Sequence, residues 1–109
     1  MTTQQDLIEK LQPLIAYIST LDRMRKVVLF GSFARHQQTI TSDVDIAIIH
    51  QGHNPQKLRQ QLSRGLYEYY QGEEDIQFTT LQEDVYNADT HPLNVSYAIA
   101  KEGVILWQK

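Results

Sequence analysis

The chain of 109 residues has no cysteine, three prolines, five glycines and a single tryptophan. Without cysteine it cannot form a disulfide scaffold, a thiolate metal site or a thiol nucleophile. The lack of disulfides is compatible with a reducing cytosol. Apolar residues make up 41% and charged residues 21% of the chain, which argues against a disordered or fibrous protein. We therefore expect one folded domain spanning residues 1–109.

Long apolar runs and an excess of basic charge are also missing. Every apolar run is far shorter than the roughly 18–20 residues that cross a bilayer, so we expect no membrane span. The first fifteen residues have early acidic side chains and no apolar core, unlike a secretory signal, and we expect a cytoplasmic protein. Lys and Arg number 10 against 13 Asp and Glu. Because binding along a phosphate backbone needs clustered cations, we expect no direct binding to nucleic acid.

Hydrophobic periodicity predicts alternating helices and strands. Apolar residues at helical spacing indicate a first helix from Leu7 to Ile18, which Pro13 either kinks or splits in two. Short apolar or alternating runs predict strands at residues 27–30, 43–50, 75–79 and 104–107. Further helices are predicted from Asn54-Pro55 to Gln71-Gly72 and from His91-Pro92 to Gly103. This order indicates an α+β fold, a small mixed or antiparallel sheet with helices packed on one face.

Acidic side chains stand at the starts of two of these strands. Residues i and i+2 of a strand point to the same face with Cα atoms about 6.6 Å apart, so Asp43 and Asp45 can converge on one cation or bridge two. Two carboxylates this close repel each other, and divalent Mg²⁺ removes that conflict. A pair of such ions can hold both the attacking and the leaving oxygen of a phosphate displacement. Asp75, on an adjacent strand, would complete the set by binding metal and accepting the proton of the attacking hydroxyl.

A glycine–serine pair follows the strand at 27–30. Glycine lets the backbone approach a phosphate without a Cβ clash, and the Ser32 hydroxyl can add a hydrogen-bond donor. Residues 32–37 are predicted to form one or two helical turns, whose free N–H groups and positive dipole end would face the same point. Arg35 could reach a phosphate or the developing charge. Gly31, Ser32 and Arg35 beside a metal dyad supply what nucleotidyl transfer requires.

Each of these features also has a purely structural interpretation. A Gly-Ser pair after a strand is commonly a turn, and Asp-x-Asp is commonly a solvated strand end. Asp75 follows two glutamates and can equally be a solvated turn acid. Because all three features stand at the ends of otherwise apolar strands, their joint occurrence favours the catalytic interpretation.

The segment LFGSFARHQQTITSDVDIAII resembles the nucleotidyltransferase signature of the DNA polymerase β-like superfamily: Gly-Ser, ten residues, then Asp-x-Asp. Asp75 in DIQF matches the third carboxylate of that signature. The short length and the ending NVSYAIAKEGVILW are similar to the minimal nucleotidyltransferases, the MNT proteins. One departure is His36, where members often have glycine, and it removes no ligand.

This resemblance implies the DNA polymerase β-like nucleotidyltransferase fold, an activity and a partner. MNT proteins are commonly antitoxins paired with an HEPN-domain toxin, an RNase, and are understood to transfer AMP from ATP to a tyrosine of that toxin. The resemblance places the triphosphate of ATP at Gly31 and Ser32. It places Mg²⁺ at Asp43 and Asp45, with Asp75 on the acceptor side.

Other functions remain open at this point. A non-catalytic antitoxin would mask its toxin by binding, and Tyr67, Tyr69 and Tyr70 are candidates for such a surface because Tyr is enriched at interfaces, although packing would also explain them. Transfer to a small molecule such as an aminoglycoside is a further alternative, but the enzymes of that type carry an additional helical domain. The chain has a donor site and no evident acceptor domain, so we expect the acceptor to belong to another protein.

Overall fold

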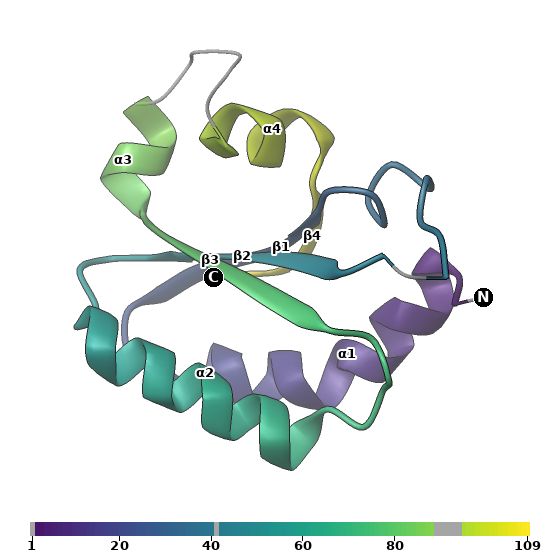
Figure 1. Ribbon diagram of the computed structural model, residues 1–109. Coiled ribbons are helices and arrows are strands. Elements are labelled where there is room, and N and C mark those ends of the chain that lie inside the picture. The colour runs from purple at the N-terminus through teal and green to yellow at the C-terminus, as the bar shows by residue number, and fades with distance from the viewer. Residues whose placement is uncertain (1, 41, 89–94) are drawn as a thin grey trace.

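The computed structural model of the protein describes residues 2–40, 42–88 and 95–109. In chain order its elements are α1 (Gln4–Ser19), β1 (Met24–Phe30), β2 (Val44–His50), α2 (Pro55–Tyr69), β3 (Ile76–Gln82), α3 (Glu83–Ala88), α4 (Val95–Glu102) and β4 (Val104–Gln108) (Figure 1). All four predicted strands are present, and β1 and β3 each run three residues further than predicted. No helix within the described ranges is long and apolar enough to span a membrane.

The four strands form one mixed sheet in the order β3-β2-β1-β4. β1 pairs antiparallel with both β2 and β4, whereas β2 pairs parallel with β3. A parallel pair needs a crossover connection, and α2 provides it between β2 and β3. The α+β fold with a mixed sheet is therefore confirmed.

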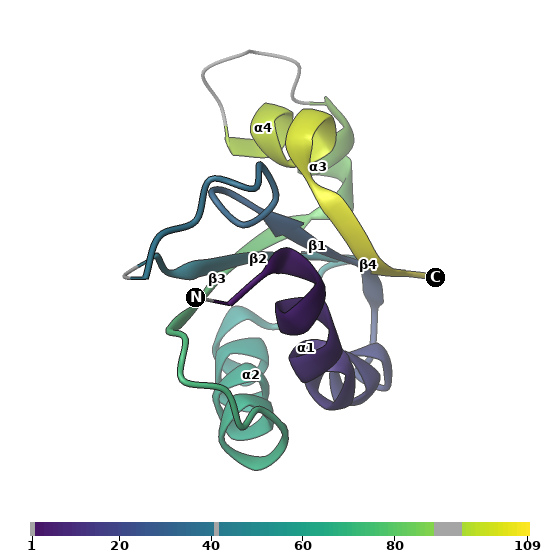
Figure 2. The same cartoon turned by 90° about the vertical axis from the view of Figure 1, so that its right-hand side faces the viewer.

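Helices cover both faces of the sheet. The two long helices α1 and α2 lie on one face, and the short helices α3 and α4 lie on the other (Figures 1 and 2). The expectation of helices on one face is therefore correct only for the long pair. The difference arises because Ile99 of α4 and Tyr86 of α3 pack with residues of β1 and β2 in a second, smaller apolar cluster. α3 itself has no buried residue, so its sequence carries no clear apolar stripe.

Side-chain alternation along β2 serves both layers at once. Val44, Ile46 and Ile48 belong to the main core under α1 and α2. Ala47 and Ile49 belong to the cluster on the opposite face, as the strand period of two requires. The predicted alternation is therefore confirmed, and Asp45 falls on the same face as Ala47, toward α3 and α4.

The ends of the long helices follow their sequence signals. Asn54 caps α2 by accepting the Lys57 N–H at 3.0 Å, and a proline occupies the first turn, as predicted. α1 begins with a capping box between Thr3 and Asp6 and continues through Pro13 to Ser19, so the proline does not split it. The predicted start of the last helix at 91–92 lies outside the described residues.

The tyrosines late in α2 have three different environments. The Tyr69 ring stacks on Tyr17 of α1 at a centroid distance of 5.0 Å, and the Tyr70 hydroxyl donates to Glu74 at 2.6 Å. Tyr67 is 91% exposed. Two of the three tyrosines therefore make internal contacts, although Tyr69 remains 39% exposed.

Two buried histidines, His50 and His53, lie at the end of β2 and in the loop that connects it to α2. The His53 N–H donates to Nδ1 of His50 at 3.1 Å, so this ring nitrogen is unprotonated. Burial lowers the pKa of His50, and the nearby His53 lowers it further. Both effects favour the neutral form of His50 in the folded protein.

Acid should destabilise the protein through His50. Because the folded pKa lies below the ordinary 6.5, the unfolded chain takes up the proton first. The stability contributed by His50 is complete above pH 6.5 and is lost as the pH falls from there through the lowered folded pKa. The variant His50→Asn keeps a side-chain acceptor for the His53 N–H. When the pH is lowered, its free energy of unfolding should fall less than that of the wild type. Urea unfolding at about pH 8 and about pH 5 measures the difference.

His36, which is exposed, provides the matched control. His36→Asn should retain the pH dependence of the wild type. If wild type and His50→Asn lose the same stability between the two pH values, the assignment to His50 is wrong.

Candidate active site

Gly31 terminates β1 against an acidic side chain of β2. The register pairs Phe30 with Asp45, which brings the next residue of the chain beside that carboxylate. Gly31 has φ of +74°, and a Cβ placed on it would lie 2.2 Å from Oδ2 of Asp45. Both facts require glycine, since other residues are strained at positive φ and would displace the carboxylate.

Asp43 and Asp45 repel each other across the start of β2. Burial raises the pKa of Asp45, the charge of Asp43 raises it further, and the guanidinium of Arg35 partly offsets both effects. A divalent cation would relieve this repulsion, and paired carboxylates are the oxygen donors that Mg²⁺ prefers. The two side chains therefore fit a Mg²⁺ site open to additional ligands from a substrate.

Asp75 stands beside Asp43 across the β2–β3 ladder. Its carbonyl accepts the Val44 N–H at 2.8 Å, and the parallel pairing of Val44 with Ile76 follows directly. Asp75 thus directly precedes β3, the strand next to β2, whereas the sequence predicted that it lies on this strand. Among the described residues, no three His, Cys, Asp or Glu side chains are grouped closely enough to hold a metal. The three aspartates therefore stand at the neighbouring starts of β2 and β3, and their side chains form no metal-binding cluster.

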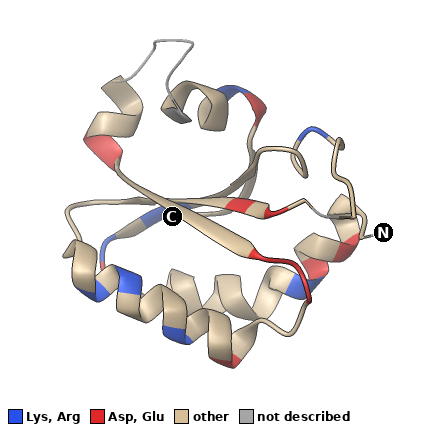
Figure 3. Ribbon diagram, in the orientation of Figure 1, with Lys and Arg blue, Asp and Glu red and all other residues tan. Residues whose placement is uncertain are grey.

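A cleft of about 900 Å³ is lined by Asp43 and Asp75, whereas Asp45 is not among its lining residues. Its walls come from Thr2 and the first half of α1, from residues 73–75, and from Phe33, Thr39, Ile40, Ser42 and Asp43. Most of the ionisable side chains that line it are acidic: Asp6, Glu9, Asp43, Glu73, Glu74 and Asp75. Figure 3 shows acidic segments at the starts of α1, β2 and β3 at the same end of the molecule. We call this feature the acidic cleft.

The predicted helical turns after Gly31 reduce to one hydrogen-bonded turn. The Arg35 N–H donates to the Gly31 carbonyl at 3.2 Å, and the Gln37 N–H to the Ser32 carbonyl at 2.8 Å. The expectation of a helix dipole at this point is wrong, because one turn aligns too few peptide units. Within the described ranges, the N–H groups of Ser32 and Phe33 donate no backbone hydrogen bond. The turn therefore still offers donors to a phosphate.

Arg35 links this turn to α4. Its Nη1 lies 3.2 Å from Oε2 of Glu102, and its Nε donates to Gln37 at 3.1 Å. The same guanidinium lowers the pKa of Asp45, which places its charge near the carboxylate pair. His36, the departure noted in the sequence, has φ of +56°, a conformation that glycine adopts without strain.

The sequence profile described as "Polymerase beta, Nucleotidyltransferase" matches residues 12–109, which include Gly31, the turn after it and all three aspartates. The chain belongs to this nucleotidyltransferase family. No curated protein matches the chain significantly in sequence.

Solved structures share the fold of this nucleotidyltransferase. A proposed nucleotidyltransferase from Sulfolobus solfataricus has a TM-score of 0.66 and 21% identity, covering 97% of this chain and 84% of its own. A toxin–antitoxin crystallised with AMP-PNP has a TM-score of 0.58 and 17% identity, covering 99% and 75%. A mutant of the toxin–antitoxin MntA–HpeT has a TM-score of 0.58 and 18% identity, and the match covers 99% of this chain and 75% of that one. At these identities the similarities establish the fold.

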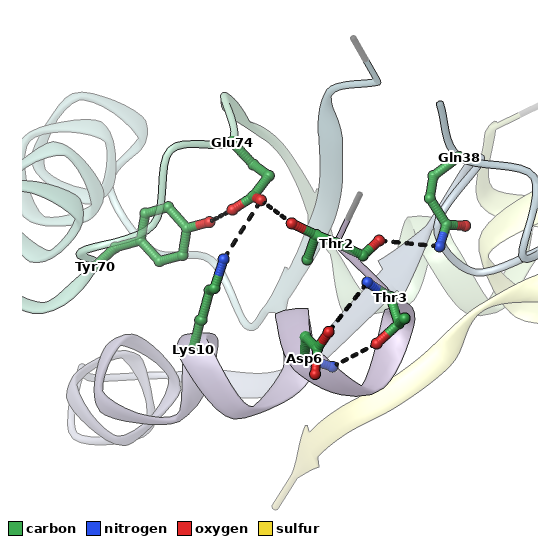
Figure 4. A network of polar contacts seen from close by, with 7 residues as sticks. All are labelled: Thr2, Thr3, Asp6, Lys10, Gln38, Tyr70 and Glu74. Carbon is green, nitrogen blue, oxygen red and sulfur yellow. Dashed lines mark hydrogen bonds and ion pairs between the residues drawn. The ribbon is translucent and has the colours of Figure 1, made fainter. Parts of the chain in front are cut away.

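Sequence reasoning missed a polar network at the wall of the acidic cleft. Glu74 lies at the centre of a polar network: Thr2 and Tyr70 donate hydrogen bonds to its carboxylate, and Lys10 Nζ lies 3.5 Å away (Figure 4). Burial alone would raise the pKa of Glu74, but these partners outweigh it and lower the pKa to about 2. Nothing in the local sequence signals this network, because Thr2 precedes α1, Lys10 lies within α1 and Tyr70 follows α2.

Adding a methyl group at Gly31 should disrupt the site. Gly31→Ala is expected to destabilise the fold by about 2 kcal/mol or more through backbone strain and overpacking. It should also weaken the binding of Mn²⁺, used as a Mg²⁺ substitute, because Asp45 must move. Urea unfolding and calorimetric titration with Mn²⁺ measure the two effects.

Gly52→Ala is a matched control, because Gly52 has the same φ of +74° while its added Cβ would lie 3.7 Å from its nearest neighbour, Nη1 of Arg23. It should reproduce the cost of backbone strain and leave Mn²⁺ binding intact. Equal Mn²⁺ affinity in the two alanine variants would contradict the contact with Asp45.

Proposed function

We propose that this nucleotidyltransferase is Mg²⁺-dependent and transfers AMP from ATP to a tyrosine of a partner HEPN toxin, acting as the antitoxin of the pair. The observation that carries this proposal is the contact of Gly31 with Asp45, beside the mutually repelling Asp43. That contact joins a backbone suited to phosphate binding to a carboxylate pair suited to a divalent cation. The toxin–antitoxin crystallised with AMP-PNP, which shares this fold, supports the choice of donor and partner.

The donor side of the site consists of Gly31, Ser32 and Arg35. Among the described residues, the backbone N–H groups of Ser32 and Phe33 donate no backbone hydrogen bond, and the Ser32 hydroxyl has no hydrogen-bond partner. These donors can bind the β- and γ-phosphates of ATP. The guanidinium of Arg35 adds positive charge where the triphosphate would meet the carboxylates.

Asp43 and Asp45 would hold Mg²⁺ between the protein and the triphosphate. When bound, Mg²⁺ neutralises phosphate charge and orients the α-phosphate for attack. β2 holds the Asp45 backbone between β1 and β3, and Asp43 lies one residue before this strand. Asp75 also supplies a ligand in this proposal and stands nearest to the acceptor.

The reaction is a displacement at the α-phosphorus. The tyrosine oxygen forms a bond to this phosphorus while the bond to the β-phosphate oxygen breaks, and pyrophosphate leaves. Asp75 accepts the phenolic proton, so the products are the AMP-tyrosine ester, pyrophosphate and a proton on the carboxylate. Catalysis then depends mainly on position and charge, as is general for phosphoryl-group chemistry.

The acceptor enters from outside the chain in this proposal. Asp43 and Asp75 are both exposed and line the acidic cleft, which opens to solvent. A tyrosine carried on a partner protein can therefore reach the base without any rearrangement of the sheet.

Removing the carboxylate pair should abolish transfer. We expect Asp43→Asn combined with Asp45→Asn to lower the rate of AMP incorporation into the partner toxin by about a hundredfold or more, since the charges that position the donor are lost. The assay incubates the protein with the toxin encoded beside it, Mg²⁺ and ATP, and weighs the toxin by mass spectrometry. Asp22→Asn, at an exposed site before β1, should leave the rate unchanged.

The same assay separates transfer from masking. If the double variant still binds the toxin and restores growth without an AMP adduct, neutralisation occurs by binding alone and the proposed activity is wrong. An adduct that persists in the double variant would also contradict it.

A further inference from the structure

The segment between α2 and β3 is held by a side chain rather than by its backbone. Within the described residues, no backbone–backbone hydrogen bond involves residues 71–74. The first such bond in this region joins the Asp75 carbonyl to the Val44 N–H. A segment without backbone bonds depends on side-chain contacts for its conformation.

Glu74 provides those contacts. Its side chain is 14% exposed and receives hydrogen bonds from Thr2, before α1, and from Tyr70, at the end of α2. Lys10 of α1 adds an ion pair at 3.5 Å. Because the three partners belong to two different helical regions, they restrain the segment from two directions (Figure 4).

Gly72 shows how closely the segment wraps around this network. A Cβ on Gly72 would lie 2.2 Å from the Tyr70 hydroxyl oxygen and 2.8 Å from Oε1 of Glu74. The backbone therefore passes directly over the Tyr70–Glu74 hydrogen bond. The position of the next residues in the chain is set by this contact.

We propose that Glu74 is a positioning residue for Asp75. Glu74 holds the Asp75 carboxylate beside Asp43 at the wall of the acidic cleft. Glu74 fixes the backbone immediately before Asp75, and the bond to Val44 fixes it immediately after. Asp75 is thus anchored on both sides while its side chain stays exposed. The inference rests on the proposed function, since it takes Asp75 as a metal ligand.

The test measures the affinity of the full chain for Mn²⁺ by isothermal titration calorimetry. Tyr70→Phe removes one hydrogen bond to Glu74 without changing the charge, and Glu74→Gln removes the ion pair. Both variants should weaken Mn²⁺ binding by about tenfold, which is typical for the loss of a group that orients a metal ligand. Hydrogen exchange of the Val44 amide, whose acceptor is the Asp75 carbonyl, should become faster in both.

Two controls separate positioning from charge and from stability. Glu73→Gln removes the same charge from the neighbouring exposed residue and should weaken Mn²⁺ binding by less than about threefold. Asn54→Ala removes the cap of α2, which costs about 1 kcal/mol of stability, and should leave Mn²⁺ binding unchanged.

A double variant tests whether Glu74 acts through Asp75. If it does, adding Glu74→Gln to Asp75→Asn should weaken Mn²⁺ binding no further than Asp75→Asn alone. Additive losses, or equal losses in Glu73→Gln and Glu74→Gln, would overturn the positioning role while leaving the proposed function intact. A wild-type protein that binds no Mn²⁺, or an Asp75→Asn variant that binds it normally, would overturn the proposed role of Asp75 and this inference together.

Discussion

The antiparallel register between β1 and β2 is the constraint on which the candidate site depends. It pairs Phe30 with Asp45 and so brings Gly31 against the carboxylate. A slip of one residue would turn every side chain of β2 to the opposite face and drive Asp45 into the main core. The burial of Ile46 and Ile48 on one face, with Ala47 on the other, prevents this slip. Core packing therefore determines where the acidic pair stands.

Electrostatic repulsion at this strand end is partly offset by a neighbouring side chain. Two carboxylates at one strand end repel each other, and burial raises the pKa of Asp45 further. Arg35 partly compensates, and it is itself held by Glu102 at the end of α4. The small layer on the second face thus does more than cover the sheet, because Glu102 of α4 holds a guanidinium whose charge acts on Asp45.

Much of the fold and part of the site follow from the sequence alone. The alternation in β2, the Asn54 cap and the four strands are local patterns, and each is confirmed. The Gly-Ser and Asp-x-Asp spacing identified the right strand ends, because these residues interrupt otherwise apolar segments. The roles assigned to Asp43, Asp45 and Asp75 remain predictions.

Other features had no local signal. The helix expected after Gly31 is a single turn, and the α3 layer was missed because α3 buries none of its residues. The Glu74 network was beyond reach, since its partner Thr2 lies 72 positions away along the chain. Long-range side-chain contacts of this kind depend on the packing of whole elements, which periodicity does not report.

The mixed pairing of the sheet has a consequence for how the site forms during folding. The antiparallel pairing of β1 with β2 closes a loop of residues 31–43. The parallel pairing of β2 with β3 closes a longer segment, residues 51–75, which contains α2. The shorter closure costs less chain entropy and is reached sooner. A nascent chain can therefore bring Gly31 against Asp45 before Asp75 reaches its place beside Asp43.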